Sequence, residues 1–248
     1  MSGTSGDGVD ASIINSDAQN SYKVLINKYF KYSKKLSQKI HNLKSKINNL
    51  DDIKKLKLEV NELEREITIF HSKIVTDILK DEALNPDFIG FHGQTILHSP
   101  TDRFSKQLGD GKLLSQLVGK QVIYNFRQND IKNGGEGAPL TPIFHQIMVK
   151  QNKINTPVCI LNIGGISNLT LIKDDSNIGI ISKDLGPGNC LIDEWIRRNN
   201  KGNYDVDGEI AMSGKTNDLI LNQALDNFDN RPNKDLSLIH ISEPTRHE

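Results

Sequence analysis

Between residues 21 and 82, apolar side chains recur every three or four positions among lysines and asparagines. This spacing places the apolar side chains on one face of a helix. Polar residues at 48, 49, 51 and 52 interrupt it, so the pattern predicts a helical hairpin that turns there. We expect the pair to pack on its own domain with its lysines in water; a coiled-coil surface for a partner is the alternative. The apolar positions are Leu36, Ile40, Leu43, Ile47, Leu50, Leu56, Val60, Leu63, Ile67, Phe70, Ile74 and Ile78.

From residue 88 onward the pattern changes to short apolar runs separated by glycine turns. Short runs rich in β-branched residues are typical of strands in a largely buried sheet. Alternation of such strands with helical stretches predicts an α/β fold. We expect strands at 88–91, 121–126, 158–163, 169–172 and 178–181, and helices at 111–118, 142–149 and 190–199.

The composition argues against several classes of protein. The 248 residues carry 31 basic and 31 acidic side chains, so no net charge directs the chain to nucleic acid or to a membrane surface. No apolar run reaches the roughly 18 residues of a membrane span, and the N-terminus lacks a secretion signal, so we expect a cytoplasmic protein. Cys159 and Cys190 are isolated in sequence, which indicates neither a disulfide framework nor a zinc site. We expect both to be buried as small apolar residues.

The chain opens with a glycine-rich segment, residues 1–10, that suits a triphosphate. Its glycines allow backbone amides to approach phosphate oxygens, and Thr4 and Ser5 add hydroxyl donors. Asp7 or Asp10 offers a carboxylate to a magnesium ion. A flexible terminus is the alternative interpretation of the same composition.

Two later segments present side chains suited to sugar hydroxyls. His92 and Gln94 follow a predicted strand, where imidazole and amide groups can bind hydroxyls, although His92 is equally well explained as a histidine satisfied within a turn. Arg127 and Asp130 precede the glycine-rich residues 134–140. They form either a clamp on polar ligand groups or a surface ion pair beside a flexible loop.

Two segments of the C-terminal half combine a glycine turn with polar side chains. Residues 161–170 predict a strand, a turn at Gly164 and Gly165, and a second strand. Residues 184–189 place Asp184 immediately before a glycine-proline bend. A carboxylate there can accept a proton from a bound water, as a general base does.

Taken together and in this order, the segments resemble the anhydro-N-acetylmuramic acid kinase family. The resemblance covers most of the chain outside residues 21–82, which match no motif of the family. The matching segments are residues 1–10, 92–95, 107–110, 126–130, 134–140, 162–168, 184–189, 193–195 and 204–208.

The resemblance implies an α/β fold with the two lobes of the actin, Hsp70 and hexokinase type and ATP between them. The second lobe is then truncated, and residues 21–82 are a helical insert. The implied parts are the phosphate loop and start of lobe 1 (1–20), the helical hairpin (21–82), the rest of lobe 1 with the sugar motifs (83–150), a partial lobe 2 with the aspartate motif (151–236) and a non-native tail (237–248).

The resemblance also implies an activity that depends on ATP and Mg²⁺. Relatives of this kind add water to open the 1,6-anhydro ring of anhydro-N-acetylmuramic acid and phosphorylate O6, giving N-acetylmuramate 6-phosphate and ADP in the recycling of cell-wall sugar. Asp184 is then the general base, and Asp7 the metal ligand. The nucleotide-binding residues implied are Gly3, Thr4, Ser5, Gly6, Asp7, Gly8, Val9, Asp10, Gly164, Gly165 and Asn168. The sugar-binding residues implied are His92, Gln94, Arg127, Asp130, Gly186 and Asn189.

Two alternatives stay open. One is a kinase of levoglucosan, the 1,6-anhydro form of glucose, which Asn125 favours because the bacterial pattern has Asp there, and which the helical insert also favours. The other is a non-catalytic remnant that binds nucleotide or a partner. Because residues 237–248 lack periodicity and do not follow the family, we also expect a truncated gene model. Half of the ATP cleft is then absent, so we expect no turnover from these 248 residues. A homodimer is compatible with the resemblance.

Overall fold

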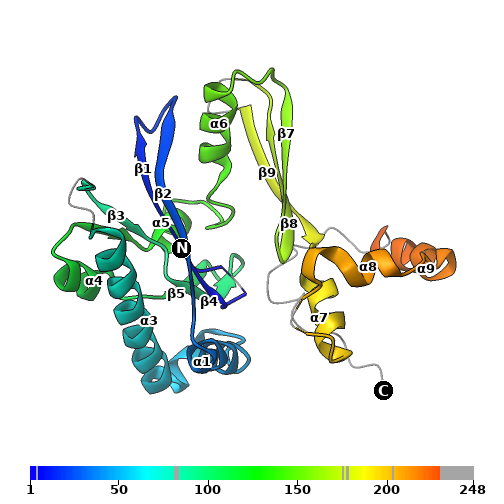
Figure 1. Ribbon diagram of the computed structural model, residues 1–248, viewed down its shortest axis with the longest axis horizontal. Helices are drawn as coiled ribbons and strands as arrows, with labels where there is room; N and C mark the ends of the chain where they lie inside the picture. Colours follow the sequence, from blue (N-terminus) through cyan, green and yellow to red (C-terminus); the bar gives the residue numbers. More distant parts are fainter. Residues whose placement is uncertain (4, 81–83, 175, 177–178, 203, 230–248) are drawn as a thin grey trace. The chain divides into compact units, whose positions relative to one another are not determined.

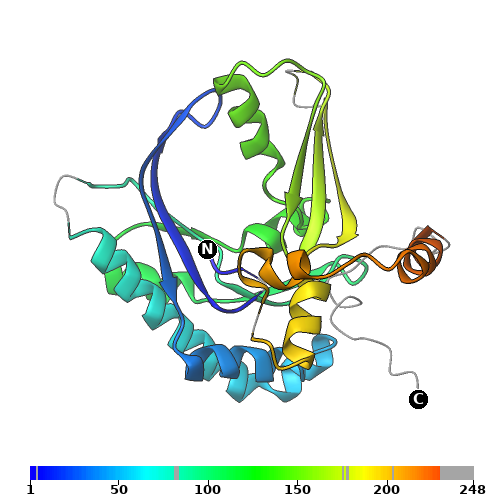
Figure 2. The same ribbon diagram turned by 45° about the vertical axis from the view of Figure 1, so that its right-hand side comes forward.

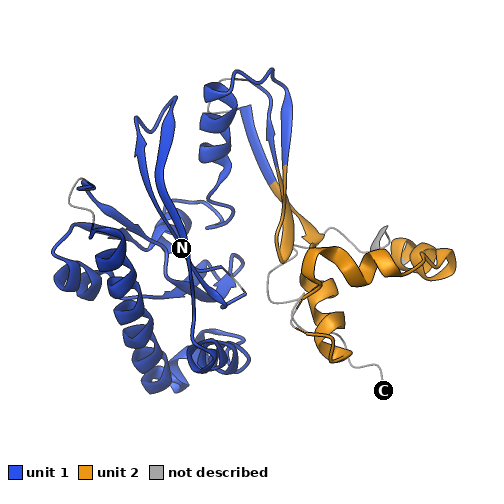
Figure 3. Cartoon of the chain, viewed as in Figure 1, with its two compact units in different colours: residues 1–160, 170–182 blue, residues 161–169, 183–248 orange. Residues whose placement is uncertain are grey.

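The computed structural model describes residues 1–3, 5–80, 84–174, 176, 179–202 and 204–229 (Figure 1). Thr4, Ile178 and the tail at 237–248 therefore lie outside the described residues. The chain divides into two compact units: unit 1 is residues 1–160 and 170–182, and unit 2 is residues 161–169 and 183–248 (Figure 3). Strands of the last sheet contribute to both units, so the units do not follow the expected lobe ranges 83–150 and 151–236, which stay a prediction.

Helices and strands alternate along the chain, which confirms the α/β prediction. No described helix combines the length and apolar character needed to cross a membrane. The strands are β1 Gly8–Ser16, β2 Tyr22–Lys31, β3 Ile89–Phe91, β4 Gln94–Ser99, β5 Phe104–Leu108, β6 Val122–Tyr124, β7 Val158–Ile163, β8 Ile166–Ile172 and β9 Ile180–Pro187. The helices are α1 Lys34–Lys44, α2 Leu50–Lys55, α3 Lys57–Ile78, α4 Gly111–Val118, α5 Phe126–Lys132, α6 Pro142–Gln151, α7 Cys190–Arg198, α8 Glu209–Ser213 and α9 Asp218–Asp229, with a short 3₁₀ turn at Val206–Gly208.

The prediction that helix begins near residue 21 is wrong, because residues 22–31 form strand β2. It pairs with β1 in an antiparallel hairpin, from Gly8 opposite Lys31 to Ser16 opposite Tyr22. Tyr22, Ile26 and Phe30 are the half-buried positions of β2. Residues four apart lie on the same face of a helix. They also lie on the same face of a strand, because successive strand side chains alternate between the two faces, so the spacing alone does not distinguish the two.

The rest of the predicted hairpin is helical and packs on its own unit, as expected. Ser33 caps α1 by accepting a hydrogen bond from the Leu36 amide, and Asn49 caps α2 at the predicted break. These caps satisfy amides that the first helical turn leaves unpaired. Helix α3, cyan in Figure 2, packs against α1, α4 and β5. The buried apolar residues of α1 and α3 are Leu36, Ile40, Leu43, Val60, Leu63, Ile67, Ile74 and Ile78.

Two small strand pairs follow in unit 1. Strands β3 and β6 pair in parallel, and β4 and β5 form an antiparallel hairpin. The apolar pattern predicted β3 and β6 but not β4 and β5. Strand β4 carries Gln94, Thr95 and His98, which are all buried, so its sequence does not look like an apolar run.

Helix α4 begins at Gly111 and ends at Val118, as predicted. Asp110 starts it by accepting hydrogen bonds from the amides of Lys112 and Leu113, and Gly119 ends it with φ of 65°. These are the ordinary start and stop signals of a helix. Helices α6 and α7 also fall where the apolar pattern placed them, within two residues at each end.

Strands β7, β8 and β9 form a three-stranded sheet in that order. The expectation of a largely buried sheet is wrong for β7, because Leu161 and Ile163 are 52% and 56% exposed. The cysteine prediction is wrong as well, since Cys159 is exposed and Cys190 is half-buried. Cys159, Leu161 and Ile163 alternate along an edge strand, and one face of that strand is open in the part of the chain that the structure describes.

Candidate ligand-binding site

The N-terminal loop of unit 1 is held against strand β4 by Gln94. The Gln94 side-chain amide donates to the Gly3 carbonyl over 2.9 Å, and its oxygen accepts from the Ser2 hydroxyl. Tyr32 donates to the same hydroxyl over 3.1 Å. Gln94 is fully buried and these contacts hold the loop, while its expected contact with the sugar stays a prediction. Ser2 lies within the predicted segment 1–10, whereas Tyr32 was not among the predicted site residues.

The loop itself closes by short local contacts. The Gly6 amide donates to the Gly3 carbonyl over 3.2 Å, and Gly6 has φ of 62°. The Ser5 hydroxyl donates to the Asp7 carboxylate over 2.7 Å. Asp7 and Asp10, the two predicted magnesium ligands, are both exposed, whereas Val9 is buried.

His92 is fixed in one orientation through both ring nitrogens. Its Nδ1 lies 2.8 Å from the Gly93 carbonyl and therefore carries the proton. Its Nε2 accepts from Arg127 Nε over 2.9 Å. Burial and the nearby Arg127 charge lower the pKa of His92 to about 4, so the ring is neutral near pH 7.

Arg127 and Asp130 both bind Gly137 in the glycine-rich loop. Arg127 donates to the Gly137 carbonyl over 2.9 Å, and the Asp130 carboxylate accepts from the Gly137 amide over 2.8 Å. A side chain at Gly135 would meet that carboxylate at 2.1 Å. These contacts hold the loop and link it to His92, and the clamp on polar ligand groups stays a prediction.

The buried histidine His71 gives the stability of unit 1 a pH dependence. His71 on α3 is buried, and burial lowers its pKa to about 4. The unfolded chain then binds more protons than the folded chain below its ordinary pKa of about 6.5, so stability is complete above that value and falls as the pH drops towards 4. We expect a loss on the order of 3 kcal/mol from His71 alone.

Replacing His71 by Phe should remove this part of the acid destabilisation while keeping an aromatic ring. Phe removes the hydrogen bond between His71 Nδ1 and the Ile67 carbonyl, 2.8 Å, whereas Nε2 has no partner within the described residues, so stability at pH 7 should fall by about 1 kcal/mol. The measurement is denaturant unfolding between pH 4 and pH 7, with His41→Gln on the exposed face of α1 as the control. An unchanged pH dependence in His71→Phe would show that other groups cause it.

In unit 2, the predicted turn at Gly164 and Gly165 is hydrogen-bonded to the residues that follow β9. The amides of Gly188 and Asn189 donate to the carbonyls of Gly165 and Gly164 over 2.9 and 2.8 Å. The Asn189 side chain donates to the Ile163 carbonyl over 3.3 Å. A side chain at Gly188 would meet the Gly164 carbonyl at 2.3 Å, which explains the glycine there. The amides of Gly188 and Asn189, just before α7, are therefore engaged within the chain.

Asp184 lies inside strand β9, which continues to Pro187, so the expectation that it sits at the bend is corrected. It is half-buried, and Gly186 two residues later has φ of 148°, a conformation that other residues rarely adopt. Strand β9 lies next to β8 in the three-stranded sheet. In the same unit, Asn168 on β8 has a buried side-chain oxygen without a hydrogen-bond partner among the described residues.

The donor set fits Mg²⁺ only in part. Mg²⁺ is usually held by one or two carboxylates together with water and substrate phosphates. Asp7 offers an exposed carboxylate of this kind beside the N-terminal loop. No cluster of three His, Cys, Asp or Glu side chains occurs among the described residues, so any ion would depend on phosphate oxygens.

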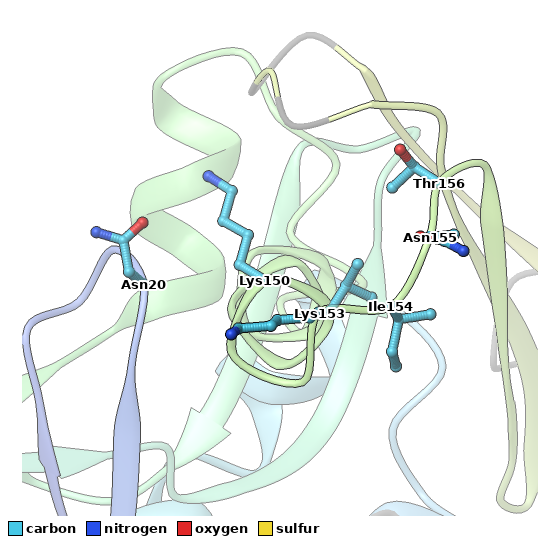
Figure 4. Close-up of a pocket in the computed structure, with 7 residues that line it drawn as sticks. Asn20, Lys150, Lys153, Ile154, Asn155 and Thr156 are labelled. Atoms are coloured by element: carbon cyan, nitrogen blue, oxygen red, sulfur yellow. The ribbon is translucent and has the colours of Figure 1, made fainter.

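A hollow in unit 1 lies apart from these candidates. It has a volume of about 630 Å³ and is lined by the tip of the β1–β2 hairpin and the end of α6 (Figure 4). The lining residues are Asn20, Val149, Lys150, Lys153, Ile154, Asn155 and Thr156. None of them was a predicted site residue, so the hollow is not the expected sugar site.

The described residues form a mixed α/β protein in which glycine turns pack beside polar side chains. The family model described as anhydro-N-acetylmuramic acid kinase matches residues 1–234. The chain belongs to this family, as its motifs predicted. The match covers residues 21–82 too, so it gives no support for regarding that segment as an insert.

Three bacterial relatives bear the name anhydro-N-acetylmuramic acid kinase. The protein of Pelagibacter ubique (strain HTCC1062) is 53% identical over 234 residues, 94% of this chain and 62% of the relative. The protein of Gluconobacter oxydans (strain 621H) is 39% identical, over 91% of this chain and 62% of the relative. The protein of Brucella canis is 37% identical, over 86% and 58%. The chain thus spans less than two thirds of the relatives it matches.

Proposed function

We propose that the chain is part of an ATP-dependent kinase that opens the 1,6-anhydro ring of anhydro-N-acetylmuramic acid and phosphorylates O6 in the cytoplasm. The products are N-acetylmuramate 6-phosphate and ADP. The observation that carries the proposal is the pairing of Gly164 and Gly165 with Gly188 and Asn189, which fixes the end of the strand that bears Asp184. Family membership supports the kinase activity.

Asp184 acts as the general base in this proposal. Its carboxylate takes one proton from a water as the water oxygen bonds to the anomeric carbon, and the bond from that carbon to O6 breaks. The electron pair of the broken bond stays on O6, which becomes a nucleophile for phosphorus. Bound Mg²⁺-ATP supplies the γ-phosphoryl group that O6 accepts, and ADP leaves. The half-buried setting of Asp184 lets it reach a bound ligand and limits competing water.

The N-terminal loop is proposed to bind the phosphates. Gly3, Gly6 and Gly8 bring the backbone close to a ligand, and Asp7 faces solvent where it can bind Mg²⁺. Gly8 has no room for a side chain, because a Cβ there would meet the Tyr29 hydroxyl at 2.5 Å. Gly164, Gly165 and Asn168 are the proposed nucleotide contacts of unit 2, where the unpartnered oxygen of Asn168 can accept a hydrogen bond.

His92, Arg127 and Asp130 are proposed for the sugar in unit 1, and Gly186 and Asn189 in unit 2. A neutral His92 can accept or donate hydrogen bonds to hydroxyls if a ligand exchanges for its present partners. The argument from Asn125 for levoglucosan becomes weaker, because Asn125 has φ of 62°. Asparagine and aspartate both adopt this conformation more readily than most residues, so backbone geometry explains the position without reference to the sugar.

A substrate comparison tests the proposal. Because the chain spans 62% of the Pelagibacter ubique relative, turnover is measured in a full-length chimera, the relative with this chain's matched 234 residues in place of its own. We expect ATP consumption with anhydro-N-acetylmuramic acid to exceed that with levoglucosan by at least about tenfold in kcat/KM, since polar groups built for one ligand discriminate against another that leaves them unpaired. A preference for levoglucosan would overturn the assigned substrate, and consumption with neither sugar would overturn the activity.

A further inference from the structure

Helix α3 carries a row of polar side chains within its buried face. Glu64, Thr68 and His71 lie four and then three positions apart, which places them on one side of the helix. Thr68 is fully buried and His71 nearly so. Polar side chains in a buried stripe cost stability unless they make specific contacts. The row therefore requires an explanation beyond helix packing.

Two members of the row bind the backbone of the turn before α4. The Glu64 carboxylate accepts from the Gly109 amide over 3.1 Å and pairs with Lys106 over 2.7 Å. The Thr68 hydroxyl accepts from the Asp110 amide over 3.0 Å while donating to the Glu64 carbonyl over 2.7 Å. Gly109 and Asp110 belong to the family motif at residues 107–110, which has no role in the proposed chemistry. The turn is thus held by α3 through two consecutive amides.

The turn at residues 108–110 packs closely against the turn that contains His92. A side chain at Gly109 would meet the Phe91 ring at 2.5 Å, and one at Gly93 would meet the Leu108 carbonyl at 2.3 Å. Such close backbone approach leaves little freedom for one turn to move without the other. His71 adds a direct contact, because its ring lies edge-on to the Phe91 ring with centroids 4.9 Å apart. Helix α3 therefore supports the residues on both sides of His92.

We infer that Glu64, Thr68 and His71 are positioning residues for the sugar-side turn, acting through the 108–110 turn and Phe91 to set the orientation of His92. The inference rests on the proposed function only for the identity of the ligand. None of the three needs to touch the sugar. The helix that the sequence pattern presented as a simple amphipathic element is then the support for ligand recognition in unit 1.

The test uses the 248-residue chain with Thr68→Val, which keeps the shape of the side chain and removes the acceptor for the Asp110 amide. We expect the Kd for anhydro-N-acetylmuramic acid, measured by calorimetry, to rise at least about tenfold, with the Kd for ADP within about twofold of the parent. Thr68→Ser restores the hydroxyl and should restore sugar affinity. Sugar binding unchanged in Thr68→Val, or sugar and ADP weakened equally, would overturn the inference.

A second pair of variants covers the case in which Thr68→Val does not fold. Glu64→Leu removes the acceptor for Gly109 and should weaken sugar binding about tenfold, whereas Glu64→Gln keeps an acceptor and should change it little. Equal affinity in both variants and the parent would count against positioning.

The ring of His92 provides a readout that is independent of any ligand. In ¹⁵N-detected spectra of the histidine rings, Thr68→Val should alter the Nε2 signal of His92 that reports its hydrogen bond from Arg127, and Thr68→Ser should not. If the 248-residue parent chain binds no anhydro sugar, this spectrum alone decides the inference, and the full-length chimera decides the sugar assignment of the proposed function. An unaltered His92 signal in Thr68→Val would then overturn it.

Discussion

Replacing Asp184 by Asn should lower kcat of the full-length chimera with anhydro-N-acetylmuramic acid by roughly a hundredfold to ten-thousandfold. The amide is nearly the same size as the carboxylate but cannot accept a proton at neutral pH, so the general base is lost while the shape of β9 is kept. The Kd for ADP should stay within about twofold, because the change removes a reacting group and not a nucleotide contact.

The matched control is Asp77→Asn, the same chemical change at an exposed residue of α3 that pairs with Lys80. It should leave kcat within about twofold. Turnover of Asp184→Asn close to that of this control would remove Asp184 from the base role. A parallel loss of ADP binding would indicate instead that Asp184 shapes the nucleotide site.

Replacing Gly93 by Ala should destabilise unit 1 by about 3 kcal/mol or more. Gly93 has φ of 72°, where a side chain is strained, and its new Cβ would meet the Leu108 carbonyl at 2.3 Å. Strain and overpacking therefore add at one position. Because His92 precedes Gly93, sugar affinity should fall together with stability.

Gly119→Ala separates the two causes. Gly119 has φ of 65° but nothing within 4 Å of an added Cβ, so it carries the strain without the clash and should cost only about 1 kcal/mol. Unfolding should be followed by circular dichroism, since Trp195, the single tryptophan, belongs to unit 2 and its fluorescence reports on that unit. Equal losses in the two variants would mean that the Leu108 carbonyl moves aside without cost.

The sequence predicted best those elements whose boundaries are marked by local signals, such as a capping side chain or a glycine turn. Helix α4 was located at both ends because Asp110 can cap it and Gly119 can leave it in a left-handed conformation. The strand, glycine turn and strand around Gly164 were located because apolar runs flank two glycines. In these segments local preference and final structure agree, so nothing distant needs to be known.

The errors occurred where tertiary contacts decide. Strand β2 looked helical because its covered residues are four apart. Strand β4 was not predicted, because several of its buried side chains are polar. Their hydrogen-bond partners are distant in sequence, as the Gly3 carbonyl is for Gln94. The exposure of Cys159 depends on what covers a sheet face, which the residues of β7 do not encode.

For the candidate site, sequence motifs named residues, and the structure adds contacts that the motifs do not contain. Gln94, predicted at the sugar, also holds the N-terminal loop through the Gly3 carbonyl. Glu64 and Thr68 carried one usable signal, since polar residues fell within the apolar stripe of α3. A motif shows that a residue type is needed at a position, whereas its role depends on neighbours that are distant in the chain.

Arg127 joins two segments that are far apart in sequence, the His92 ring and the Gly137 carbonyl, with a single guanidinium group. Because that group is planar and rigid, tilting the imidazole also pulls on the glycine-rich loop. A sugar that displaces the ring must therefore shift the loop in the same event. Carbohydrate entry and loop displacement would then form one concerted step. A substitution anywhere in that loop should therefore change the association and dissociation rates of the carbohydrate.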